Sequence, residues 1–232
     1  IIHEFRSPLS LIMGHASLLK KEEYWQHNKD DHLSAIRNQS LLLREMTEEL
    51  LDLARLDNNQ IKVAPAMCEW PEFLKQIWLQ FTPRAKRKNL SYLLDLQGKK
   101  ETLIFIDKKK VARVVSNLID NALKFTPSNG QVKVRGEYRG DTLFISVQDS
   151  GPGIPPEELP HIFERYFKGN TEIKSGFGIG LSLSQTYTEL MGGTLEVDSK
   201  PGQGSCFLFC VPTATAPAAE ASEPIMPTLA RP

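Results

Sequence analysis

Apolar residues near the amino end of the chain recur at helical spacing. One series is Ile2, Phe5, Leu9, Ile12, Ala16 and Leu19, and a second is Ile36, Leu43, Met46, Leu50 and Leu53. In the first series steps of three and four positions alternate, which places its members on one side of a helix. A polar stretch at 24–29 separates the two series. The pattern therefore predicts two helices that form a hairpin over residues 1–59.

A hairpin with one apolar stripe on each helix cannot enclose a core by itself. Two copies can pair into a four-helix bundle, which buries both stripes. We therefore expect a homodimer that assembles through the hairpin. The alternative is that the hairpin covers part of the remaining chain, and the pattern alone favours neither.

The pattern changes after residue 59. Runs rich in β-forming residues at 131–135, 143–148, 194–198 and 205–211 alternate with helical segments at 71–86, 108–124 and 179–191. This alternation predicts an α/β domain over residues 60–212, and the whole chain is of the α+β class. Residues 213–232 are rich in Ala and Pro, which predicts a linker or a disordered tail.

Composition and charge exclude several classes of protein. Lys plus Arg and Asp plus Glu both number 28, so no overall field draws the chain to nucleic acid. Three cysteines without metal-site spacing suggest neither disulfides nor zinc. No apolar stretch reaches the ~20 residues of a membrane-spanning helix. We expect a cytoplasmic chain.

Two asparagines on one helix face are the first candidate chemistry. Asn117 and Asn121 lie one turn apart on the helix predicted at 108–124, and Lys124 follows a turn later. An amide oxygen can bind Mg²⁺ beside phosphate oxygens, and a lysine can neutralise those phosphates. Taken alone, such a pair is also common on a solvated helix face.

A carboxylate and two glycines follow the strand predicted at 143–148, in the order Asp149-Ser150-Gly151-Pro152-Gly153-Ile154. The carboxylate can accept a hydrogen bond from the amine of a base, and the glycines let the backbone approach a flat ring. An ordinary turn between strand and helix is the alternative.

A second glycine motif, Gly176-Phe177-Gly178-Ile179-Gly180-Leu181, stands at the start of the last predicted helix. Backbone N–H groups there and the helix N-terminus together favour a phosphate. The spacing differs from that of dinucleotide folds and of P-loops, so the sequence argues against both.

In this order the three motifs resemble those of the ATP-binding domain of sensor histidine kinases. The resemblance extends to Phe163-Glu164-Arg165-Tyr166-Phe167, and His3-Glu4-Phe5-Arg6-Ser7-Pro8-Leu9 resembles the phospho-acceptor box of that family. It covers all of the chain except the tail. The resemblance implies a two-layer α/β sandwich for the second domain, the Bergerat ATP-binding fold.

The resemblance also implies ATP and Mg²⁺ as cofactors and assigns the site. Asn121 would be the metal ligand, residues 155–175 would form a lid, and Asp149 would recognise the adenine amine. The expected ATP-binding residues are Asn117, Asn121, Lys124, Phe125, Asp149, Gly151, Gly153, Ile154, Tyr166, Gly176, Phe177, Gly178, Ile179, Gly180 and Leu181.

The expected catalytic residues are His3, Glu4 and Ser7. A neutral imidazole has a lone pair that can attack phosphorus, and by resemblance Glu4 would hold its tautomer. Ser7 replaces the Thr or Asn more common in the family, where that side chain serves in dephosphorylating the partner. The implied reaction is autophosphorylation of His3, followed by transfer to an aspartate of a response regulator.

Two other functions compete with this interpretation. One is a nucleotide-binding scaffold that has lost phosphotransfer, and the other is a serine kinase or an ATPase. ATPase relatives carry a glutamate at the position of Asn117, and an amide cannot act as that base. The resemblance further implies an upstream sensor with membrane segments, outside this sequence.

Overall fold

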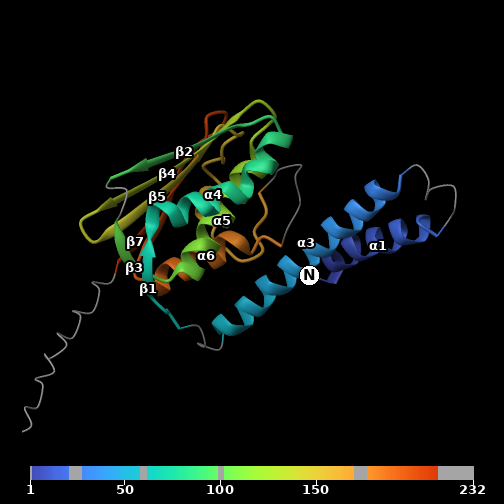
Figure 1. The fold of residues 1–232 in the computed structure, drawn as a ribbon, viewed down its shortest axis with the longest axis horizontal. Helices are drawn as coiled ribbons and strands as arrows, with labels where there is room; N and C mark the ends of the chain where they lie inside the picture. The colour runs from blue at the N-terminus through green and yellow to red at the C-terminus, as the bar shows by residue number, and fades with distance from the viewer. Residues whose placement is uncertain (1, 21–27, 58–61, 99–101, 170–176, 214–232) are drawn as a thin grey trace, which may run out of the picture.

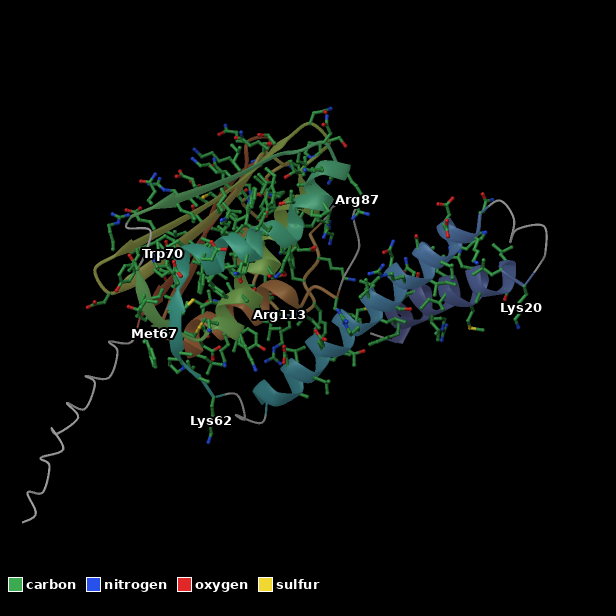
Figure 2. The ribbon with its side chains drawn as sticks, in the orientation of Figure 1. Lys20, Lys62, Met67, Trp70, Arg87 and Arg113 are labelled. Atoms are coloured by element: carbon green, nitrogen blue, oxygen red, sulfur yellow. The ribbon has the colours of Figure 1, made fainter. Side chains whose placement is uncertain are left out.

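The computed structural model describes residues 2–20, 28–57, 62–98, 102–169 and 177–213, without the side chains of residues 2–4, 45, 49 and 55–57. Two parts are visible, a helical hairpin and a sheet covered by helices (Figure 1). Lys20, at the loop end of the hairpin, lies far from the sheet (Figure 2). The end of the second helix lies beside the sheet domain (Figure 1).

The hairpin consists of α1 (Ile2–Leu18) and α3 (Lys29–Asp57), as the apolar spacing predicts. Pro8 of α1 is buried, and His15 meets His32 across the hairpin. Leu9, Met13, Leu33 and Leu51 remain between 44% and 63% exposed. One copy of the hairpin thus leaves an apolar face uncovered.

The second part is built on a five-stranded sheet with strand order β2-β4-β5-β7-β6. Its strands are β2 (Ser91–Gln97), β4 (Gln131–Arg139), β5 (Thr142–Asp149), β6 (Thr194–Lys200) and β7 (Gly204–Pro212). β2 pairs with β4 in parallel, and the other pairs are antiparallel. A separate two-stranded sheet pairs β1 (Ala66–Glu69) with β3 (Leu103–Ile106).

Helices α4 (Trp70–Arg87), α5 (Lys108–Phe125) and α6 (Gly180–Leu190) cover one face of the larger sheet (Figure 1). A short 3₁₀ helix, η1 (Leu159–His161), lies between β5 and α6 in the chain. The α/β sandwich expected from the sequence is confirmed, with a helix layer and a sheet layer.

Alternation in the strands explains why the sheet buries one face. In β5 Leu143, Ile145 and Val147 are at most 1% exposed, while the residues between them are more accessible. The facing stripe of α5 includes Val114, Leu118 and five further buried apolar residues at helical spacing. These two faces form the core.

Two local features hold the helix layer in place. Asp107 caps α5, because its side chain accepts hydrogen bonds from the backbone N–H groups of Lys109 and Lys110, both 3.1 Å long. Trp70, the first residue of α4, is labelled in Figure 2 and is 1% exposed. It packs where Gly136 of β4 leaves no side chain in its way.

The hairpin also packs against the second part of the same chain. Met46 and Leu53 of α3 are 5% and 6% exposed and belong to the common core. α3 contacts α6, and the Phe5 ring of α1 lies 5.4 Å from the ring of Phe177. In one chain, therefore, the hairpin does cover part of the remaining structure. Within the described residues, no helix is long and apolar enough to cross a bilayer.

Candidate functional site

A cavity of about 270 Å³ lies where α5, the start of α6, the segment after β5 and α3 come together. α5 contributes Asn117, Asn121 and Lys124 to its wall. The three positions share one face of α5 because they are separated by four and three residues. The helical spacing in the sequence thus brings them to one cavity.

The Asn117 side chain is held between α5 and α6. Its Nδ2 donates a 2.9 Å hydrogen bond to Oγ of Ser184, which is 2% exposed. A Cβ atom on Gly180 would overlap Oδ1 of the same amide. The glycine at the start of α6 is therefore needed for this close approach of α6 to Asn117.

Positive charge gathers on one side of the cavity. Lys124 and Lys168 both line it. Burial lowers the pKa of Lys124, and the charges of Lys168 and Arg84 lower it further, while Asp120 opposes the shift. Asp120 also lines the cavity and pairs with Arg84 of α4. An anion bound here would offset the repulsion between the two lysines.

Asp149 lies in the cavity wall at the end of β5 and is 9% exposed. Its Oδ1 accepts a 2.8 Å hydrogen bond from the backbone N–H of Gly151. Burial raises the pKa of the Asp149 carboxyl above its ordinary 3.8, and hydrogen bonds from the N–H groups of Gly151 and Ser205 oppose part of that rise. The carboxylate is thus fixed in place at a partly desolvated position, suited to accept a hydrogen bond from a ligand.

The glycine-rich segment closes another side of the cavity. Gly178 has φ +71°, which favours glycine, and its carbonyl oxygen accepts a 2.9 Å hydrogen bond from the N–H of Tyr166. α6 begins at Gly180 without a side-chain cap, and both Gly180 and Leu181 line the cavity. The first N–H groups of an uncapped helix favour an anion there.

The structure brings most of the expected ATP-binding residues to this one cavity. Those in its wall are Asn117, Asn121, Lys124, Phe125, Asp149, Gly153, Ile154, Phe177, Gly178, Gly180 and Leu181. Three others do not line it. The backbone N–H of Gly151 donates a hydrogen bond to the Asp149 side chain. Ile179, the residue before α6, is fully buried. Tyr166 is 51% exposed and has a left-handed backbone, with φ +68°. Gly176 lies outside the described residues.

The expected catalytic residues lie on α1. Positions 3 and 4 belong to its first turn, but the side chains of His3 and Glu4 are outside the described part of the chain. Ser7 is exposed and does not line the cavity.

Several residues of the cavity were not among the expected ATP-binding residues. Phe167 and Lys168 belong to the segment 155–175 that was expected to form the lid, and Asp120 stands beside Asn121 on α5. Leu42 and Met46 reach the cavity from α3. The helical series around Met46 marked it as apolar, but no local pattern indicated contact with a site formed more than 70 residues later.

Two family models match the chain. Residues 1–59 match the His Kinase A (phospho-acceptor) domain. Residues 106–215 match the histidine kinase-, DNA gyrase B- and HSP90-like ATPase. The two matches fall on the hairpin and on the part of the α/β domain that forms the cavity.

Individual relatives agree with these matches. Over 91% of its length the chain is 31% identical to the sensor histidine kinase RcsC of Escherichia coli K12, of which it covers 22%. It is 32% identical to the adaptive-response sensory kinase SasA of Crocosphaera subtropica, of which it covers 57%. Full-length ShkA in complex with AMPPNP is a similar solved structure, with a TM-score of 0.70 and 29% identity, covering 93% of this chain and 45% of ShkA. The chain thus spans less than two thirds of each relative.

Proposed function

The chain belongs to the histidine kinases, and from this membership we propose that it is the kinase core of a two-component sensor. ATP bound in the cavity phosphorylates His3, and the phosphoryl group then passes to an aspartate of a response regulator. The hairpin, residues 1–59, carries the acceptor, and residues 60–212 bind the nucleotide. The observation that carries the proposal is the cavity itself, whose wall joins an anion-binding helix start to the acceptor hairpin.

Asp149 is the residue that recognises adenine. Its buried carboxylate accepts hydrogen bonds only, and the adenine amine is a donor. Ile154, Ile162 and Phe207 provide apolar wall for the flat ring nearby. ShkA, a relative of similar fold, was solved with AMPPNP, an ATP analogue, which supports the same ligand here.

The triphosphate lies toward Lys124, Lys168 and the start of α6. Two ammonium groups and the first N–H groups of a helix are the donors that phosphates favour. Burial is the main cause of the lowered Lys124 pKa, and the smaller part that comes from repulsion by Lys168 and Arg84 is relieved when phosphate charge enters. Binding is therefore coupled to this local charge.

A divalent cation can bind at this site together with the nucleotide, whose phosphate oxygens would supply part of its ligands. Among the described residues no group of three or more His, Cys, Asp or Glu side chains could hold a metal ion. Mg²⁺ accepts one or two protein oxygens together with phosphate oxygens and water, and the Asn121 amide supplies such an oxygen. When bound, Mg²⁺ neutralises charge on the transferring phosphates.

The residues beside the phosphates favour transfer of the phosphoryl group to a histidine nitrogen over hydrolysis of ATP. Asn117 is an amide that donates to Ser184 and cannot remove a proton from water. The imidazole of His3 attacks the γ-phosphorus with its lone pair. The bond from that phosphorus to the bridging oxygen breaks, its electron pair leaves on ADP, and the ring releases a proton. Glu4 holds the ring tautomer during this step.

The proposed partners follow from the family and from the exposed surface. The apolar face with Leu9, Met13, Leu33 and Leu51 is the surface through which two hairpins form a four-helix homodimer. The receiver domain of a response regulator accepts the phosphoryl group, and Ser7 assists its later removal. The chain works in the cytoplasm, downstream of a membrane-bound sensor, and binds no nucleic acid.

Labelling tests the proposal. The unsubstituted chain and the variants His3→Gln and Asn121→Ala, the second of which removes the oxygen ligand, are each incubated with γ-labelled ATP and Mg²⁺. We expect the unsubstituted chain to carry label that is lost in acid and survives alkali. Neither variant should carry label. Label on His3→Gln, or label that resists acid, contradicts phosphohistidine. Nucleotide binding without label supports a scaffold that has lost phosphotransfer.

A further inference from the structure

Three side chains form a row across β5, β7 and β6 at the cavity. In the register of the sheet Asp149 of β5 lies opposite Ser205 of β7, and Ser205 lies opposite Ser199 of β6. Side chains that are directly opposite on neighbouring strands point to the same face of a sheet. Asp149 and Ser205 line the cavity and are 9% and 8% exposed. Ser199 is therefore the next side chain in the row, one strand further from Asp149.

The Ser199 hydroxyl has a full set of hydrogen-bond partners. Because a carbonyl oxygen only accepts, the Ser199 proton goes to the carbonyl oxygen of Gly204, at 2.9 Å. The Ser199 Oγ accepts a 2.8 Å hydrogen bond from the backbone N–H of Ile154. Oγ of Ser205 also lies 2.9 Å from it. A hydroxyl has one proton and two lone pairs, so the Ser205 hydroxyl is the donor in this last contact.

The direction of the Ser205 hydroxyl decides what it can offer to a ligand. With its proton committed to Ser199, its Oγ can only accept hydrogen bonds on the cavity side. The Asp149 carboxylate beside it is also an acceptor, and the backbone N–H of Ser205 donates a hydrogen bond to it. Two adjacent acceptors favour a base that carries N–H donors at this place and disfavour a base that carries a carbonyl.

The same Ser199 hydroxyl also fixes the segment that follows β5. Pro152 and Ile154 of this segment line the cavity. The N–H of Gly202, in the turn between β6 and β7, donates a 2.7 Å hydrogen bond to the carbonyl oxygen of Pro152. Two residues further on, the Ile154 N–H bonds to Ser199. Ser199 thus connects an apolar residue of the wall to the hydroxyl of Ser205.

We propose that Ser199 is a positioning residue for the choice of base, an inference that rests on the proposed function and on the role given there to Asp149. Ser199 holds the Ser205 hydroxyl as an acceptor toward the cavity, so that the wall accepts the amine of adenine and rejects a carbonyl at the same ring position. Ser199 does not itself line the cavity, so it acts through Ser205 and Ile154. Its substitution should therefore change the ratio of the affinities for two bases.

Titration calorimetry of the full chain with ATP and with ITP tests this role. ITP carries a carbonyl where ATP carries the amine, and the sugar and triphosphate are the same. In Ser199→Ala the Ser205 hydroxyl is free to turn and donate to that carbonyl. The ratio of ATP affinity to ITP affinity should therefore fall about three- to tenfold, the factor that one neutral hydrogen bond gives.

Two variants serve as controls for Ser199→Ala. Ser199→Thr keeps a hydroxyl and should restore the ratio. Ser146→Ala removes a hydroxyl from the opposite face of β5 and should leave the ratio unchanged. Circular dichroism verifies that each chain folds. If Ser199→Ala is unfolded, Ser199→Cys replaces it, because a thiol of similar size makes weaker hydrogen bonds.

A double variant tests whether Ser199 acts through Ser205. Ser205→Ala removes the directed hydroxyl itself, and adding Ser199→Ala to it should change the ratio no further.

An unchanged ratio in Ser199→Ala, or an equal loss of both affinities, overturns the inference and leaves the proposed function intact. So does a double variant whose effect is the product of the two single effects. If the unsubstituted chain binds no ATP, or binds ITP equally well, the proposed role of Asp149 fails together with this inference.

Discussion

The substitution Asp149→Asn should weaken ATP binding and leave the stability of the fold nearly unchanged. The carboxylate of Asp149 is 9% exposed and lies in the cavity wall, where the proposal gives it the adenine amine as a donor. A hydrogen bond to a charged acceptor contributes about 1.5–3 kcal/mol. Since 1.4 kcal/mol corresponds to a factor of ten in affinity, the variant should bind ATP roughly 10- to 100-fold more weakly.

The effect of Asp149→Asn on folding should be small. Burial raises the pKa of Asp149, so ionisation at neutral pH opposes folding, and removing the charge relieves that cost. Weaker hydrogen bonds from the N–H groups of Gly151 and Ser205 act in the other direction. We expect the free energy of unfolding at pH 7 to change by less than about 1 kcal/mol. Urea titration measures this change.

Base preference gives the sharpest readout for Asp149. Guanine carries a carbonyl where adenine carries the amine, so the carboxylate should reject GTP, and an asparagine NH₂ group should accept it better. Titration calorimetry with ATP and with GTP measures the ratio. Asp198→Asn makes the same chemical change on the exposed side of β6 and should leave the ratio unchanged. An ATP preference that survives in Asp149→Asn would refute the role of this carboxylate.

Three further changes test separate parts of the site. Ser184→Ala removes the acceptor for the Asn117 amide, and initial labelling rates should fall about fivefold, in line with ~1 kcal/mol for a buried hydrogen bond, while Ser184→Thr keeps most of the rate. Lys168→Gln should raise the KM for ATP about three- to tenfold and leave kcat nearly unchanged, whereas Lys20→Gln, far from the cavity, should alter neither. Burial alone would raise the pKa of Asp107, but hydrogen bonds from Lys110 and the Ala64 N–H lower it below 3.8, so its stabilisation is present above that pH and lost as the pH falls. Urea titrations of Asp107→Asn should therefore show a deficit of about 1–3 kcal/mol at neutral pH that closes in acid, and a constant deficit would contradict this.

The long, strongly periodic elements were predictable because one local pattern specifies each of them. The stripe of α5 and the alternation of β5 gave elements that differ from the expected bounds by a residue or two. β1 and β3 have only four residues each, too few for a period to show. β2 carries Asp95 within it and has no fully buried residue, so its amphipathic signal is weak.

The residues of the candidate site also differ in whether a local sequence pattern could predict them. Asn117, Asp149 and Gly178 belong to short motifs, where neighbours in the sequence specify the backbone that brings them to the cavity. Met46 arrives from α3 by long-range packing, which leaves no local signal. Tyr166 shows the converse, because it stands in a recognisable motif but its left-handed backbone leaves the ring exposed.

Locating the transferred phosphoryl group on the intact chain decides whether ATP bound in the cavity phosphorylates a histidine nitrogen. After incubation with ATP and Mg²⁺, fragmentation mass spectrometry at alkaline pH identifies the modified residue. We expect the phosphoryl group on His3 and nowhere else, in amounts that match the ADP released. Free phosphate released with an unmodified chain, or a phosphoryl group on a serine or threonine oxygen, would show that this protein is not a histidine kinase.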